Sequence, residues 1–118
     1  MIILNNENEL TKLKERNLFS KEIINWVKKD MMFIFNDFPH LKYNNNLITY
    51  VLVEPKESIK SLVVNNVDLI SQTKPINISF YKNQNIIKAT TKTTHNHYVS
   101  IYFYRYTSIQ LMNWILKL

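Results

Sequence analysis

The sequence of 118 residues contains no cysteine and no glycine. Without cysteine, the chain cannot form disulfides, thiolate zinc sites or a cysteine nucleophile. Without glycine, it lacks the loops that cradle phosphates and the strand-to-helix elbow of serine hydrolases. No catalytic or cofactor signature stands out in what is left, so we expect neither a cofactor nor a bound metal.

Long apolar runs and a secretion signal are also missing. No stretch is apolar over the length needed to span a bilayer. The opening Met-Ile-Ile-Leu is followed by Asn5, Asn6 and Glu7, so it lacks the cationic start and long apolar core of a signal peptide. We therefore expect a cytoplasmic protein without membrane contact, folded as one domain over residues 1–118.

The charge balance is basic, with a formal net charge of +6. Such a surplus suits a polyanionic partner, either nucleic acid or an acidic protein surface. The chain is also rich in Lys, Asn, Ile and Tyr, a bias that AT-rich codons produce without selection for binding. The charge thus permits such a partner without requiring one, and the composition favours an AT-rich source such as a mobile element, a phage or a low-GC bacterium.

Residues 97–106 carry the strongest strand signal, because they are almost wholly aromatic or β-branched and alternate with a period of two. Successive side chains on a strand point to opposite sides. One side would carry Val99, Ile101 and Phe103, and the other Tyr98, Ser100, Tyr102, Tyr104 and Tyr106.

Residues 76–106 are predicted to form a three-stranded meander. A two-residue turn at Asn83-Gln84 and a three-residue turn over residues 94–96 bring apolar side chains together on one face. The expected opposite pairs are Phe80 with Ile87, Ile78 with Ala89, Ala89 with Ile101, and Ile87 with Phe103.

Two helices are expected before the first interior strand. The first runs from Asn6 to about Asn17, and a stronger one begins after Ser20 and ends before Pro39. Trp26, Met32 and Phe33 widen the apolar arc of the second helix, so we expect it to touch another helix as well as the sheet. Residues 44–46 form a loop, and residues 47–53, apolar on both faces, form an interior strand.

Residues 58–71 fit either a helix or a hairpin that turns at Asn65-Asn66. The clustered β-branched residues favour the hairpin. A last helix begins after Ser108 and is apolar nearly all round, so we expect it to be buried nearly all round, inside the fold, in a dimer or against a partner. The fold class is therefore α+β, with N-terminal helices packed on an antiparallel sheet of four to six strands and a short apolar C-terminal helix.

The face of the meander opposite its apolar side is the first candidate site. Exposed tyrosines can stack on unpaired bases, at about 1–3 kcal/mol per base, while lysines meet phosphates. A second layer could instead cover this face and make the tyrosines packing residues, or the face could bind a protein. We call this surface the Lys/Tyr face; it comprises Tyr81, Lys88, Lys92, Tyr98, Tyr102 and Tyr104.

The second candidate is His95-Asn96-His97, the densest histidine cluster in the chain. His95 or His97 could act as general base in a metal-free ribonuclease, with Lys92 or Arg105 stabilising the phosphate charge. Histidines in a polar turn more commonly have no catalytic role, and nothing in the sequence defines a nucleophile and base pair.

These observations favour a small non-enzymatic binding protein, an accessory or inhibitor factor. It would engage nucleic acid, preferably single-stranded, or a nucleic-acid-handling protein through the Lys/Tyr face. One alternative is a small basic ribonuclease-type toxin. The other is an immunity or inhibitor protein that binds one protein partner, with Trp114 of the last helix as a contact. The same helix could also form a homodimer.

Overall fold

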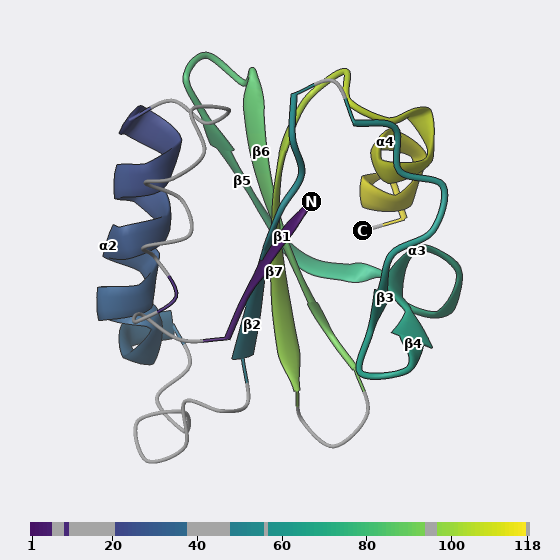
Figure 1. Cartoon of the computed structure of the whole chain (residues 1–118), viewed down its shortest axis with the longest axis horizontal. Coiled ribbons are helices and arrows are strands. Elements are labelled where there is room, and N and C mark those ends of the chain that lie inside the picture. Colours follow the sequence, from purple (N-terminus) through teal and green to yellow (C-terminus); the bar gives the residue numbers. More distant parts are fainter. Residues whose placement is uncertain (6–8, 10–20, 38–47, 56, 94–96, 118) are drawn as a thin grey trace.

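A five-stranded sheet in the strand order β1-β2-β7-β6-β5 forms the centre of the computed structural model (Figure 1). The structure describes residues 1–5, 9, 21–37, 48–55, 57–93 and 97–117. The α+β class is confirmed. The elements are β1 (Ile2–Leu4), α2 (Lys21–Asp37), β2 (Ile48–Leu52), β3 (Val63–Val64), β4 (Val67–Asp68), α3 (Leu69–Gln72), β5 (Pro75–Tyr81), β6 (Ile86–Lys92), β7 (Tyr98–Tyr104) and α4 (Ile109–Ile115).

The sheet is mixed, which corrects the prediction of an antiparallel sheet. β2 runs parallel to β7, with Ile48 opposite Tyr98 and Leu52 opposite Tyr102, whereas the other neighbours are antiparallel. The apolar pattern of β2 identifies an interior strand but contains no information on its direction. The edge strand β1 was not predicted, because three residues are too few to show an alternation.

The predicted register of the meander is confirmed at every pair. Phe80 lies opposite Ile87, which lies opposite Phe103, and Ala89 lies between Ile78 and Ile101. The amide of Asn85 donates to the carbonyl of Lys82 at 3.1 Å, closing the two-residue turn. Residues 94–96 lie outside the described part, but the amide of Thr93 donates to the carbonyl of His97 at 2.7 Å, as a three-residue connection requires.

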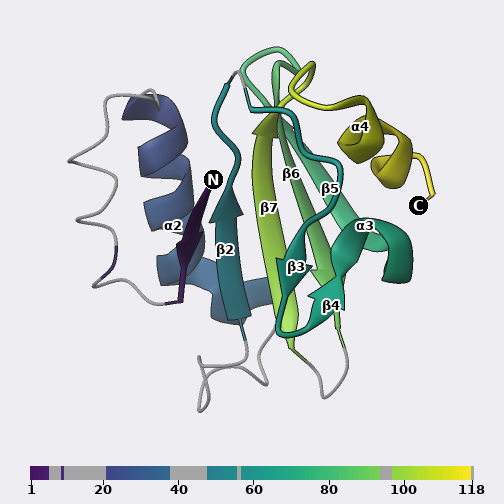
Figure 2. The same cartoon turned by 45° about the vertical axis from the view of Figure 1, so that its right-hand side comes forward.

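Each face of the sheet is covered by its own layer. α2 packs on one face, and α3, α4 and the β3–β4 hairpin lie on the other (Figures 1 and 2). Because side chains alternate along each strand, two separate cores result. Ile48, Tyr50, Leu52, Tyr98 and Tyr102 belong to the core beneath α2, and Val51, Ala89, Val99, Ile101 and Phe103 to the core on the other side.

The predicted hairpin over residues 63–68 is confirmed. Asn65 and Asn66 have φ values of 51° and 64°, the left-handed conformation that a tight two-residue turn needs. Asn tolerates this region better than most residues, and it takes the place of glycine in a chain that has none. The predicted helix over residues 6–17 and the loop over residues 44–46 fall largely or wholly outside the described part.

α4 begins at the predicted cap. The hydroxyl oxygen of Ser108 accepts the amide of Leu111 at 3.4 Å, and the indole Nε1 of Trp114 donates to the carbonyl of Thr73 at 2.9 Å. Of the three alternatives, burial nearly all round inside the fold is not what the chain shows, because Ile109 and Leu116 are exposed. A short helix lying on one sheet face has only one side to bury.

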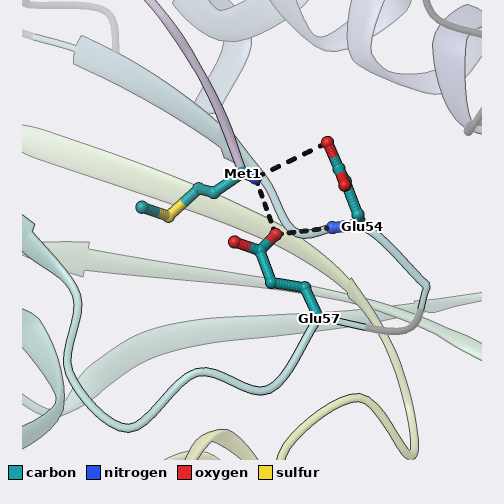
Figure 3. A network of polar contacts seen from close by, with 3 residues as sticks. All are labelled: Met1, Glu54 and Glu57. Carbon is teal, nitrogen blue, oxygen red and sulfur yellow. Dashed lines mark hydrogen bonds and ion pairs between the residues drawn. The ribbon is translucent and has the colours of Figure 1, made fainter.

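The start of β1 is held by two carboxylates that follow β2 (Figure 3). The amino group of Met1 lies 2.7 Å from Glu57 Oε2 and 3.7 Å from Glu54 Oε1. The amide of Glu54 also donates to Glu57 Oε2 at 3.2 Å. These contacts tie the edge strand to the segment beside it.

Among the described helices, none is long and apolar enough to cross a membrane.

Candidate binding surfaces

α2 covers the central part of the Lys/Tyr face. Tyr102 has 0% of its surface exposed, Tyr98 is also buried, and Lys88 is partly buried. Trp26 of α2 meets the ring of Tyr102 edge-on at 5.7 Å. No ring face of Tyr98 or Tyr102 is therefore free to stack on a base, and at these residues the structure shows the alternative in which a second layer covers the face.

A polar network joins the covering helix to the sheet. The hydroxyl of Tyr102 donates to Asp30 Oδ2 at 2.6 Å, and Lys88 Nζ lies 3.1 Å from the same oxygen. Burial, together with the charge of Asp30, holds the pKa of Tyr102 well above its ordinary value, so the phenol stays protonated and remains a donor. The network satisfies polar groups that α2 would otherwise bury without partners.

Asp30 is the residue that sequence reasoning missed. It lies on the inward side of α2 between the buried residues Val27 and Ile34. A single carboxylate on the apolar side of an amphipathic helix needs a partner across the interface. That position, together with lysines on a predicted sheet face, was the signal that could have shown the helix covering the Lys/Tyr face.

Three members of the Lys/Tyr face lie at its margins. Tyr81 stacks on Trp26 with ring centroids 4.8 Å apart, and Tyr104 packs partly buried against the same core. Lys92 is exposed, with its Nζ 5.7 Å from the ring centroid of Tyr98. These residues do not form a continuous aromatic surface in the structure.

His97 sits in a small polar cluster on the opposite sheet face. Thr49 Oγ1 lies 2.9 Å from His97 Nε2 and donates to Asn5 Oδ1 at 3.2 Å. Because the hydroxyl has one proton, which goes to Asn5, this network assigns the ring proton of His97 to Nε2. Burial lowers the pKa of His97.

The described residues of the ribonuclease hypothesis do not lie close together in the structure. Arg105 follows β7 and His97 precedes it, so strand geometry separates them by about 26 Å. Lys92 pairs with Tyr98 on the other sheet face from His97, and His95 lies outside the described residues. Within the described ranges, no group of three His, Asp or Glu side chains could hold a metal ion.

Trp114 offers no surface to a partner, because its indole is buried. Trp114 has 0% exposure and is bonded to the carbonyl of Thr73, so it anchors α4 to the fold. The predicted interface at this residue must therefore be corrected. The side chains of α4 that do face solvent are Ile109, Asn113 and, at its end, Leu116.

The outward side of α2 presents large apolar side chains to solvent. Met32 is 56% exposed and Phe33 50%, so the predicted packing of both on another helix is not seen. Lys28 and Lys29 precede them by four residues each, which makes them neighbours on the helix surface. We call this surface the outer face of α2; its described members are Asn25, Lys28, Lys29, Met32 and Phe33.

An exposed aromatic residue also follows β7. Tyr106 is 84% exposed, and the guanidinium carbon of Arg105 lies 5.7 Å from its ring centroid. The amide of Arg105 donates to the carbonyl of Asn85 at 2.8 Å, which places this pair beside the β5–β6 turn and its exposed Lys82.

A hollow of about 550 Å³ lies between the β3–β4 turn, α3 and the end of β6. Its lining contains one charged residue, Lys92, and no acid and base pair that could perform catalysis. The lining residues of the hollow are Asn66, Val67, Gln72, Thr73, Lys92 and Thr93.

Comparisons of the chain with protein families, curated proteins and solved structures find no match.

Proposed function

We propose that the chain is a small non-enzymatic binding protein, an accessory or inhibitor factor, that docks the outer face of α2 on an acidic surface of another protein. The observation that carries the proposal is the exposure of Met32 and Phe33, at 56% and 50%, beside two lysines. Large apolar side chains grouped on a surface and rimmed by polar residues mark interaction sites.

The charge of this surface has one sign. Asp30 is the only acidic residue between Asn25 and Phe33, and it points inward to Lys88 and Tyr102. Lys28 and Lys29 therefore act without a carboxylate from this stretch beside them. An acidic partner would be steered toward the lysines, and burial of Met32 and Phe33 would then supply the affinity.

The covered Lys/Tyr face favours a protein partner over free nucleic acid. Base stacking needs accessible ring faces, and Tyr98 and Tyr102 are enclosed beneath α2. One site still supports the second candidate, single-stranded nucleic acid, because Tyr106 could stack on a base while Arg105 and Lys82 contact phosphates.

Site-specific photo-crosslinking in the source cells tests the protein partner. A benzophenone amino acid replaces Phe33, and a matched variant has it at the exposed Lys60. We expect one discrete protein adduct at position 33 and none at position 60. The adduct is identified by mass spectrometry, and the purified partner is then titrated with the unmodified protein.

The titration includes two outer-face variants and a control whose charge change equals that of the lysine variant. Lys28→Glu/Lys29→Glu and Met32→Ser/Phe33→Ser should each weaken binding at least about tenfold, whereas the control Lys60→Glu/Lys74→Glu should not. Binding that is insensitive to both outer-face variants would refute the proposal. Salt-dependent binding to single-stranded RNA or DNA, lost in Tyr106→Ala, would support the second candidate instead.

A further inference from the structure

β5 is the longer of the two edge strands of the sheet, and its outer side has no strand partner among the described residues (Figure 2). The other edge strand, β1, is only three residues long. Natural edge strands are protected from pairing by shortness, charges, prolines or bulges. Pro75 and the register shift between Pro75 and Asn77 protect the start of β5, but residues 77–81 include neither a charge nor a proline.

The hydrogen bonds between β6 and β7 decide which backbone groups of β6 face β5. At one end of this ladder the amide of Thr93 donates to the carbonyl of His97 at 2.7 Å. At the other end the amide of Arg105 donates to the carbonyl of Asn85 at 2.8 Å. Bonded and non-bonded pairs alternate along an antiparallel ladder, so the odd-numbered residues of β6 bond to β7. The even-numbered residues of β6 therefore turn their N–H and C=O groups toward β5.

On β5, the residues opposite the even-numbered residues of β6 form the bonds of the ladder. Over residues 77–81 these are the odd-numbered ones, as the pairing of Ser79 with Lys88 shows. Ile78 and Phe80 alternate with them, so their N–H and C=O groups point away from the sheet. Each of these two residues thus offers one donor and one acceptor to a further strand.

An added strand would also cover apolar side chains. Ile78 and Phe80 lie on the sheet face that packs against α4, since their partners on β6 belong to the core on that side. Phe80 is 55% exposed, and Ile76, near the start of β5, is 48% exposed. Apolar residues at alternate positions of an added strand would point to the α4 side and pack beside Ile78 and Phe80.

The charge around this edge is positive. All nine Asp and Glu residues of the chain lie within residues 1–68, whereas residues 69–118 contain six Lys and Arg residues and no acid. Lys74 directly precedes β5 and Lys82 directly follows it, and both are exposed. An acidic segment along β5 would therefore meet a cation at each end.

We propose that the outer edge of β5 binds an extended acidic segment of another protein, which joins the sheet as an antiparallel strand. About four main-chain hydrogen bonds to Ile78 and Phe80 supply affinity in this arrangement. Apolar side chains beside Phe80 and acidic ends near Lys74 and Lys82 supply specificity. The site lies at the sheet edge, so its occupation does not depend on the outer face of α2.

The outward backbone groups favour a peptide over single-stranded nucleic acid. Phosphate oxygens accept hydrogen bonds and could bind the N–H groups of Ile78 and Phe80, but they have no donor for the two outward C=O groups. A peptide strand alternates donors and acceptors with the same spacing as β5 and pairs with all four groups.

A designed peptide tests this site by amide hydrogen exchange, followed by NMR. The probe is acetyl-Asp-Glu-Val-Thr-Val-Thr-Val-Glu-Asp-amide, which can place one valine opposite Ile78 and another opposite Phe80. Its matched control carries N-methyl groups on the valines, so it keeps the charge and loses the N–H groups that bond to β5. The probe should slow exchange of the Ile78 and Phe80 amides at least about tenfold, and the control should not. In the free protein both amides should exchange faster than that of Ser79, which bonds to β6.

Variants separate the role of the backbone from that of the side chains. Ile78→Pro removes an outward N–H without breaking a bond to β6, so it should weaken binding of the probe at least about tenfold, whereas Ile78→Val should bind like the wild type. Lys82→Glu should weaken binding at least about twofold, and Lys28→Glu, of equal charge change, should have less effect. Met32→Ser/Phe33→Ser should bind the probe normally, so the failure of one surface leaves the other untouched.

The absence of protection at Ile78 and Phe80 with about 1 mM probe would overturn the proposal. Equal protection by the N-methylated control would do the same, as would equal binding of the Pro and Val variants at position 78. A short oligodeoxythymidine that protects these two amides in place of the probe would also overturn it and assign the edge to nucleic acid.

Discussion

The hydroxyl of Tyr102 lies 2.6 Å from Asp30 Oδ2, and this hydrogen bond joins the central strand β7 to the helix that covers it. Lys88 shares the same carboxylate oxygen at 3.1 Å. Asp30, on the inward side of α2, therefore meets polar groups of both β6 and β7. A sequence pattern that suits a nucleic-acid platform serves here to position a helix.

Removal of the shared carboxylate should destabilise the protein strongly. Asp30→Ala leaves Lys88 and the Tyr102 hydroxyl without this partner beneath α2, and the free energy of unfolding should fall by about 3 kcal/mol. Urea denaturation measures the change. Far-UV circular dichroism before denaturation confirms that the variant is folded.

A triple variant provides the control for this network. In Asp30→Leu/Lys88→Met/Tyr102→Phe no charge or hydroxyl of the network remains, so much of the lost stability should return. Equal destabilisation of the single and the triple variant would show that the network contributes nothing beyond packing.

The free energy of unfolding should decrease as the pH falls, because of the protonation of His97. Burial lowers the pKa of His97 below its ordinary value of about 6.5, so the unfolded state binds the proton more readily. The contribution is complete above the unfolded pKa and is lost as the pH falls through it toward the folded pKa. The free energy of unfolding of His97→Gln should therefore depend less on pH.

An NMR titration of the imidazole measures this pKa directly, and urea denaturation between about pH 8 and pH 5 spans the window. A His97 pKa above its ordinary value would contradict the expectation. The difference between wild type and His97→Gln isolates this group from the other two histidines.

Substitutions on the outward side of α2 should cost much less stability than substitutions on its inward side. Met32→Ser and Phe33→Ser should change the free energy of unfolding by no more than about 0.5 kcal/mol, because both side chains are half exposed. Ile23→Ala should cost about 2–4 kcal/mol, because Ile23 is fully buried. Thermal denaturation distinguishes the two cases, and a large loss at Met32 or Phe33 would assign them a structural role.

The β3–β4 turn should accept glycine but not a branched residue. Asn66 has a φ of 64°, which glycine adopts freely and valine does not. We expect Asn66→Gly to keep the wild-type stability and Asn66→Val to lose about 1–2 kcal/mol. Equal stabilities of the two variants in urea denaturation would argue against the left-handed turn.

Trp114 should behave as an anchor of α4. It is fully buried and bonded to the carbonyl of Thr73, so Trp114→Ala should cost about 3–5 kcal/mol. Trp114→Phe keeps most of the packing and should cost less. In Trp26→Phe, where Trp114 is the remaining tryptophan, acrylamide should quench the fluorescence poorly; efficient quenching would place the indole in solvent.

The local pattern of the sequence was sufficient for the meander and for the hairpin at Asn65-Asn66. Strand alternation and turn length set which residues lie opposite one another, because a shift of one residue would move every apolar side chain to the wrong face. The cap at Ser108 and the end of α2 before Pro39 are likewise local, since they depend on side-chain oxygens and on a missing N–H.

Only the tertiary structure decided what covers each face. The alternation at Tyr98 and Tyr102 does not show whether these residues face solvent or α2. The sequence of β2 likewise does not show whether its neighbour runs parallel or antiparallel. Trp114 and Phe33 are both large apolar residues on amphipathic helices, yet one is buried and the other half exposed. Local propensity and alternation determined the elements and their sides, whereas burial depends on contacts between segments distant in the chain, such as Asp30 with Tyr102.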